Sequence, residues 1–184
     1  MPVQTPICDF GKKAIPFELK STDNKIISLD DIKGENGTLI MFICNHCPYV
    51  KAITKEIVED CNELKKIGIN SVAICSNDAV NYPDDSFDNM IKFSKNNQFS
   101  FPYLQDETQD IAKAYDAVCT PDFFGYDKDL GLQYRGRLRE LKNFIPVKDG
   151  ESDLLKAMKQ IAETGKGPQD QIPSAGCGIK WKYN

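Results

Sequence analysis

The feature that most constrains the fold is a continuous apolar run at residues 38–44 (TLIMFIC), which leads directly into a helix. A short run that is apolar on both faces, bounded by Gly37 and by polar residues, predicts a strand buried on both sides. Pro48 then suits the first turn of a helix, where its missing N–H costs nothing. The apolar residues of this helix recur at helical spacing up to Gly68 and are Val50, Ile53, Ile57, Cys61 and Leu64.

Strands and helices alternate along the rest of the chain. Alternating residues around a polar turn at 17–29 predict an N-terminal β-hairpin. Further strands are expected at 70–76, 118–127 and 133–137, a short apolar segment at 101–104, and helices at 84–96, 108–115 and 152–164. Pro121 interrupts the strand at 118–127 near its start. This order predicts an α/β protein with a central mixed β-sheet flanked by helices and a helical insertion, and the thioredoxin fold is one of the few topologies that fit.

Length and charge limit the classes of function. A chain of 184 residues suits one domain, with a core at about 10–164 and a C-terminal tail at 165–184. A net charge of −4 gives no reason to expect a nucleic-acid partner. No apolar stretch is long enough to cross a membrane, and residues 1–13 do not read as a secretory signal, so we expect a soluble, cytoplasmic protein.

The cysteine content agrees with a reducing compartment. Seven cysteines at irregular spacings do not suggest a framework of disulfides. Cys61 lies in a helical pattern and Cys75 ends an apolar run, so both are expected to pack in the core.

The strongest chemical signal is the pair Cys44 and Cys47 where the buried strand meets the helix. This spacing brings two sulfurs within disulfide reach, and a helix N-terminus favours a thiolate. We expect Cys44 to attack a disulfide because its pKa is lowered, and Cys47 to resolve the mixed disulfide. His46 lies between them and is expected to stabilise the Cys44 thiolate, which would raise the reduction potential above that of a housekeeping thioredoxin.

Two other interpretations of this pair remain. It could be half of a zinc site, although His46 is the only histidine and no second Cys pair follows, so no metal is expected. It could also be a purely structural pair, although polar neighbours argue against that.

At this point the sequence resembles a known family. The segments Cys-Asn-His-Cys-Pro-Tyr-Val-Lys (44–51) and Cys-Thr-Pro-Asp-Phe-Phe (119–124) are similar to the peroxiredoxin-like branch of the thioredoxin superfamily, also described as redoxin or AhpC/TSA-like. Residues 14–19, 27–29 and Gly34 resemble the first hairpin of redoxins. The resemblance implies a cis bond between Thr120 and Pro121 facing the dithiol, with Thr120 presenting backbone groups to a bound substrate strand.

The chain departs from the peroxiredoxin pattern PxxxTxxC. With Cys47 as the peroxide-reactive residue, Ile40 and Cys44 stand at the Pro and Thr positions, and with Cys44 these positions hold Gly37 and Met41. In neither alignment does the chain have the threonine whose hydroxyl helps to orient a peroxide in peroxiredoxins. Thiol–disulfide oxidoreductase is therefore the leading hypothesis. A cysteine-dependent peroxidase, an antioxidant activity, is the alternative, and a zinc-binding or redox-sensing module is the third.

Several other residues are secondary candidates. Cys119 and Cys177 are possible accessory thiols, with packing in the core and a docked tail carrying Ile179 and Trp181 as the plainer interpretations. The alternating Arg135, Arg137 and Arg139 predict a solvated face. The pairs Asp30-Asp31 and Asp84-Asp85 predict helix caps.

The oxidoreductase hypothesis also indicates which cofactor and partners to expect. The motif needs no cofactor, and its substrate is a protein or small-molecule disulfide. The sequence names no reducing partner.

Overall fold

The computed structural model describes residues 1–183 and is built on a seven-stranded mixed sheet. In spatial order the strands are β3 (Ile26–Ser28), β2 (Glu18–Ser21), β6 (Tyr103–Gln105), β5 (Ile69–Cys75), β4 (Gly37–Phe42), β8 (Asp122–Tyr126) and β9 (Leu132–Tyr134). β4, β5 and β6 run parallel and the other neighbours are antiparallel. The predicted thioredoxin fold with an N-terminal hairpin is therefore confirmed.

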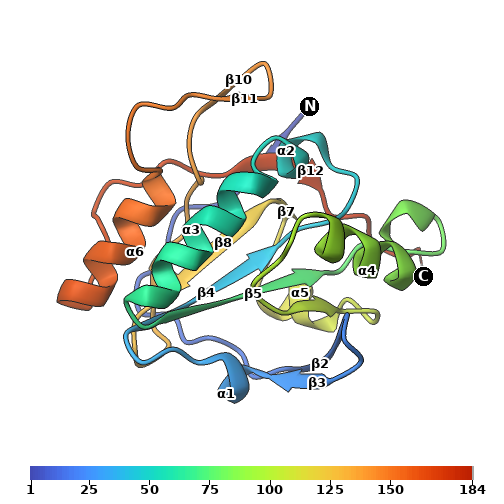
Figure 1. Cartoon of the computed structure of the whole chain (residues 1–184), viewed down its shortest axis with the longest axis horizontal. Coiled ribbons are helices and arrows are strands. Elements are labelled where there is room, and N and C mark those ends of the chain that lie inside the picture. The colour runs from blue at the N-terminus through green and yellow to red at the C-terminus, as the bar shows by residue number, and fades with distance from the viewer. Residues whose placement is uncertain (184) are drawn as a thin grey trace.

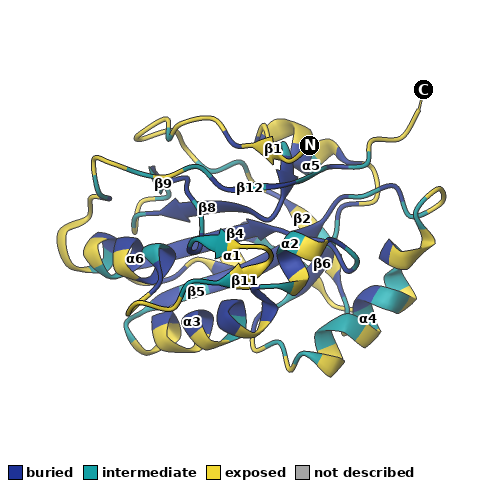
Figure 2. Cartoon of the chain, turned by 90° about the horizontal axis from the view of Figure 1, so that it is seen from above, coloured by how far each residue is buried: buried dark blue, intermediate teal, exposed yellow. Residues whose placement is uncertain are grey.

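The central strand β4 divides the core into two layers. Leu39 and Met41 point to the layer that holds α3 (Thr54–Lys66) and α6 (Asp153–Thr164). Ile40 and Phe42 point to the opposite layer, with α1 (Leu29–Ile32) and α5 (Asp110–Ala114). Because successive side chains of a strand alternate between faces, one apolar run fills both layers (Figure 2).

The strand and helix that open the site differ in their bounds from the prediction. The strand expected at 38–44 ends at Phe42, so Cys44 lies in the loop that follows it. The single helix expected after Pro48 is divided into α2 (Pro48–Lys51) and α3. The Thr54 hydroxyl donates to the Val50 carbonyl oxygen at 2.7 Å and satisfies it at this break. The predicted apolar stripe is confirmed, since all five of its residues are buried.

The later elements follow the predicted order with shorter bounds. The helix expected at 84–96 consists of the 3₁₀ turn η1 (Pro83–Asp85) and α4 (Phe87–Asn96), which Ser86 caps. The strand expected at 118–127 is split by Pro121 into β7 (Cys119–Thr120) and β8, as its sequence indicates. Ser28 and Asp31 form a capping box on α1, which confirms one of the expected acidic caps.

Two small sheets were not predicted. β1 (Val3–Gln4), β12 (Ala175–Gly178) and β7 form a three-stranded antiparallel sheet, so a strand from each terminal region lies in the sheet that contains β7 (Figure 1). β10 (Leu141–Lys142) and β11 (Ile145–Pro146) form a hairpin. Within residues 1–183 no helix has the length and apolar character needed to span a bilayer.

The alternating arginines do not form the solvated face that was predicted. Arg135 is buried and donates to both carboxylate oxygens of the fully buried Asp122. Arg139 is buried against Glu56. Only Arg137 is partly exposed, where its Nε donates to Asp153 at 2.7 Å. Each of the two buried arginines turns inward because it pairs with a buried carboxylate through charge-assisted hydrogen bonds.

Candidate active site

The two cysteines of the motif lie in the loop between β4 and α2, and both are closed off from solvent. The exposed fraction of Cys44 is 1% and that of Cys47 is 0%. Asn45, which follows Cys44, holds this loop in place through hydrogen bonds to two other parts of the chain. Its N–H donates to Asp85 Oδ1 at 2.7 Å, and its side-chain oxygen accepts from the Tyr103 hydroxyl at 2.8 Å. The positions of both sulfurs are therefore set by buried hydrogen bonds to distant elements.

Both sulfurs face Thr120 on β7. Cys44 Sγ lies 3.4 Å from Thr120 Oγ1, and Cys47 Sγ lies 3.2 Å from the Thr120 carbonyl oxygen. The peptide bond between Thr120 and Pro121 is cis. The expectation that a cis-proline segment faces the dithiol is thus confirmed.

The structure reverses the expected acidity of the two thiols. Cys47, not Cys44, is the N-cap of α2, because the helix begins at Pro48. Hydrogen bonds from the Cys44 thiol, from Cys177 and from the Val50 N–H lower the pKa of Cys47 to about 4, although burial opposes them. The pKa of Cys44 is raised, because Cys44 keeps the proton that it shares with Cys47, is buried, and faces the Asp85 carboxylate. The prediction of a Cys44 thiolate is therefore wrong.

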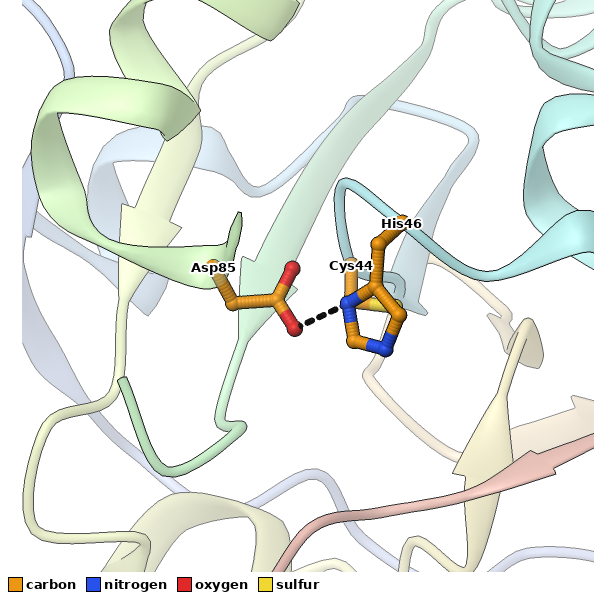
Figure 3. Close-up of side chains that lie close together, drawn as sticks. All are labelled: Cys44, His46 and Asp85. Carbon is orange, nitrogen blue, oxygen red and sulfur yellow. Dashed lines mark ion pairs between the residues drawn. The ribbon is translucent and has the colours of Figure 1, made fainter. Parts of the chain in front are cut away.

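His46 faces a carboxylate that the sequence did not identify. His46 Nδ1 lies 2.6 Å from Asp85 Oδ2, an ion pair when the imidazole is protonated (Figure 3). Asp85 is 1% exposed and also accepts from the Asn77 side chain at 2.9 Å. The expectation that Asp85 caps a helix is wrong, since Ser86 is the N-cap of α4 and leaves Asp85 free to point at the loop. Serine before Phe87 was the available signal, because it is as good an N-cap as aspartate.

Three side chains at this site have the donor atoms of a metal site. One ligand atom each from Cys44, His46 and Asp85 lies within 4.8 Å of the others (Figure 3). A thiolate, an imidazole and a carboxylate suit Zn²⁺, which takes four ligands in structural sites. For the hypothesis of a zinc-binding module, the structure thus adds Asp85 of η1 as a possible ligand, and a structural zinc site would need one further ligand.

The two accessory thiols lie on adjacent strands next to the dithiol. Cys119 is fully buried on β7, where burial raises its pKa and its Sγ donates to the Pro121 carbonyl oxygen at 3.6 Å. Cys177 is half-buried on β12 and packs against the same core layer as Cys47. Of the tail residues expected to dock, Ile179 is buried, while Trp181 is 38% exposed beside Lys113.

A pocket opens on the other side of Pro121. Its volume is about 240 Å³, and its lining includes Tyr49, Pro121, Arg137 and Ala175. The Tyr49 ring packs edge to face on Phe144, at 4.9 Å between ring centroids, in the turn between β10 and β11. Phe144 and its neighbour Ile145 are exposed, so this hairpin presents apolar side chains to solvent beside Tyr49.

Comparisons with solved structures agree with the fold. An uncharacterized conserved protein from Geobacillus kaustophilus is 45% identical, with a TM-score of 0.93 over 100% of this chain and 98% of that one. A hypothetical protein from Sinorhizobium meliloti is 32% identical, with a TM-score of 0.91 over 100% of both chains. A thiol:disulfide interchange protein of the thioredoxin family from Chlorobium tepidum is 16% identical, with a TM-score of 0.64 over 83% of this chain and 97% of that one.

A comparison with protein families identifies the family to which the chain belongs. No curated protein matches it. Residues 10–137, which include the dithiol, Asp85 and the cis-proline segment, match the AhpC/TSA family. The chain therefore belongs to the AhpC/TSA family, a redoxin branch of the thioredoxin superfamily.

Proposed function

We propose that this redox protein is a thiol–disulfide oxidoreductase whose redox-active centre is the dithiol of Cys44 and Cys47. The observation that carries the proposal is the position of Cys47. Cys47 is the N-cap residue of α2 and its sulfur faces the cis-proline segment. The hydrogen bond from the Cys44 thiol lowers the pKa of Cys47 to about 4, which favours its thiolate at neutral pH. Only the thiolate of a cysteine is nucleophilic.

The roles of the two thiols follow from this acidity. Cys47 attacks one sulfur of a substrate disulfide, which forms a mixed disulfide and releases the other substrate sulfur as a thiolate. Cys44 then loses its proton and attacks Cys47 Sγ. This step forms the Cys44–Cys47 disulfide and releases the second substrate sulfur. The substrate gains two electrons and the dithiol loses two.

The proton that Cys44 loses needs an acceptor in a buried site. His46 and Asp85 are the titratable groups beside Cys44. Asp85 is buried and in contact with His46, which is partly exposed, so the pair connects Cys44 to solvent. We assign His46 and Asp85 the task of receiving this proton and passing it to the leaving thiolate.

The surroundings of Pro121 suit a protein substrate. The pocket lined by Tyr49, Pro121 and Arg137 can hold side chains of a protein beside the cis-proline segment. Thr120 and Pro121 are assigned to substrate binding, through the backbone of the segment that faces the dithiol. We also assign the protein to the cytoplasm, where glutathione keeps its thiols reduced.

Trapping of the mixed disulfide tests this proposal. The double variant Cys44→Ser/Cys177→Ser, which has neither neighbouring thiol that could resolve the product, should accumulate a mixed disulfide through Cys47 when the reduced protein meets a disulfide-bonded protein such as insulin, and mass spectrometry of the linked peptides identifies the sulfur. Cys47→Ser should trap nothing and lose turnover. Trapping through Cys44 instead of Cys47 would reverse the assigned roles, and turnover by both variants would exclude the dithiol.

Membership of the AhpC/TSA family favours one alternative, a cysteine-dependent peroxidase. In that reaction the Cys47 thiolate attacks the peroxide, becomes a sulfenic acid, and is captured by Cys44 with loss of water. Rapid consumption of hydrogen peroxide by the reduced protein, lost in Cys47→Ser, supports this alternative. Stoichiometric Zn²⁺ in the purified protein, released by a thiol reagent, supports the third hypothesis.

A further inference from the structure

The C-terminal strand β12 occupies the edge of the cis-proline segment. β7 pairs with β12 alone in its sheet, and the register sets Cys177 opposite Thr120 and Gly178 opposite Cys119. The backbone of Thr120 and Cys119 is thus already paired by the chain's own tail (Figure 1). The tail takes the place at this edge that an extended substrate would need.

The register brings a third sulfur to the dithiol. Thr120, the partner of Cys177, is the residue that Cys44 and Cys47 both face. Cys177 lies close enough to Cys47 to lower the pKa of that thiol. Cys177 packs against the core layer that contains Cys47, and β12 contacts α2. One side chain of the tail therefore points at the sulfur that the proposed reaction uses.

The tail is held in this position on both sides of Cys177. Before it, the Ser174 hydroxyl donates to the Pro121 carbonyl oxygen at 2.6 Å, and the Thr5 N–H donates to the Ser174 carbonyl oxygen at 2.9 Å. After it, the Lys180 N–H donates to the side-chain oxygen of Asn77 at 2.9 Å. The amide of the same Asn77 donates to Asp85, so docking of the tail is linked to the His46–Asp85 pair.

Cys177 differs from Cys44 and Cys47 in its exposure to solvent. Cys44 and Cys47 are buried, whereas Cys177 is half-buried. A disulfide between Cys44 and Cys47 is less accessible to an external thiol than one that includes Cys177, because Cys177 is partly exposed to solvent. Access is one of the quantities that set the rate of thiol–disulfide exchange.

We propose that Cys177 is a third redox thiol, which receives the disulfide from the buried pair and presents it to an external dithiol or glutathione. The inference rests on the proposed function of Cys44 and Cys47. In the exchange, the Cys177 thiolate attacks Cys47 Sγ, the bond between Cys44 and Cys47 breaks, and a Cys47–Cys177 bond forms. Cys44 leaves as a thiolate and takes up the proton that Cys177 gave, so no oxidant is consumed.

The second half of the relay returns the protein to its dithiol form. An external thiol attacks Cys177 Sγ and releases Cys47 as a thiolate. A thiol of low pKa leaves faster, and the lowered pKa of Cys47 makes it the better leaving group of the two. A second external thiol then resolves the mixed disulfide on Cys177. The external thiols lose two electrons and the protein gains them.

Disulfide mapping of the full chain provides the first test. The Cys44→Ser variant is equilibrated with glutathione disulfide, quenched by alkylation and digested without reduction. We expect a Cys47–Cys177 disulfide as the main product. Cys47 linked to glutathione or to Cys119, with Cys177 alkylated, would overturn the relay.

A kinetic measurement tests the relay without removing Cys44. Oxidised Cys177→Ser keeps the Cys44–Cys47 disulfide, and we expect glutathione to reduce it about tenfold more slowly than it reduces the wild type, because the exposed sulfur is gone. Cys8→Ser is the matched control, since Cys8 is also a half-buried free thiol, and it should react as the wild type does. Equal rates for Cys177→Ser and the wild type would exclude the relay.

The two proposals fail in different ways. Absence of any disulfide that includes Cys47 in the oxidised wild type would defeat the proposed function. A Cys44–Cys47 disulfide in the wild type, together with an alkylated Cys177 in every variant, would defeat only the relay.

Discussion

His46 Nδ1 and Asp85 Oδ2 lie 2.6 Å apart, and Cys44 is next to both. The Asp85 carboxylate raises the pKa of Cys44. A positive charge on the adjacent imidazole would act on Cys44 in the opposite direction. The two residues therefore act on the same thiol with opposite sign. Together they set how readily Cys44 becomes the attacking group in the resolving step.

The opposite signs can be measured as the reactivity of Cys44, because only its thiolate reacts with an alkylating reagent. In a Cys47→Ser background, His46→Ala should slow the alkylation of Cys44 at pH 7 and Asp85→Asn should speed it, each by roughly tenfold, the equivalent of about 1.4 kcal/mol. Mass spectrometry after timed alkylation gives both rates. Asp84→Asn changes an exposed neighbour and is the control. Rate changes in the same direction would contradict this account of the pair.

The acidity of Cys47 also predicts how stability depends on pH. The folded-state pKa of about 4 lies below the usual 9.0, so between these values the unfolded chain binds more protons and stability rises with pH. From pH 5 to 7, the reduced wild type should gain stability over Cys47→Ser by up to about 1.4 kcal/mol per pH unit. Urea denaturation in a reductant measures the difference.

A second core cysteine provides the control for this experiment. Cys61 is buried and its pKa is raised to about 12, so it stays protonated in both states over this range. Cys61→Ala should lower stability by the same amount at pH 5 and pH 7. A pH-independent difference for Cys47→Ser as well would show that Cys47 is a thiol in the folded protein.

The parts of the site that were predicted are those with local patterns. The apolar run at 38–44 and the Cys44–Cys47 spacing are contiguous in the sequence, so the buried strand and the dithiol after it were found. The sequence already indicated that the helix begins at Pro48. The residue before it, Cys47, could therefore have been predicted as the N-cap instead of Cys44. The cis bond before Pro121 came from the family resemblance and not from the residues.

The parts that were missed depend on contacts between distant residues. Ala175–Gly178 has low strand propensity, and it is a strand only because Thr120 and Val3 pair with it. Asp85 faces the site because it accepts the Asn45 N–H from another element. Charge patterning suggested exposure for Arg135 because the sequence does not show that Asp122 is buried beside it.

The Arg135–Asp122 pair should be costly to break. Arg135→Ala leaves a carboxylate with 0% exposure and no counter-charge, which costs about 3–5 kcal/mol of unfolding free energy. Burial already raises the pKa of Asp122, so protonation relieves the variant and its deficit should be smaller at pH 5 than at pH 8. Arg137→Ala breaks a partly exposed pair and should cost less than about 1 kcal/mol. Urea denaturation that gives both variants the same loss would rule out this distinction.

Docking of the tail can be tested at one glycine. A Cβ on Gly176 would overlap the Thr120 carbonyl oxygen and contact Pro121 Cδ at 3.1 Å, so Gly176→Ala must move β12 away from β7. We expect a loss of about 1–3 kcal/mol and faster alkylation of Cys47, because the tail no longer covers its sulfur. Gly178→Ala is the matched control on the same strand, since its Cβ meets only Val3 Cγ2 at 3.4 Å. Mass spectrometry after timed alkylation measures the rate, and equal rates in the two variants would show that β12 does not limit access to Cys47.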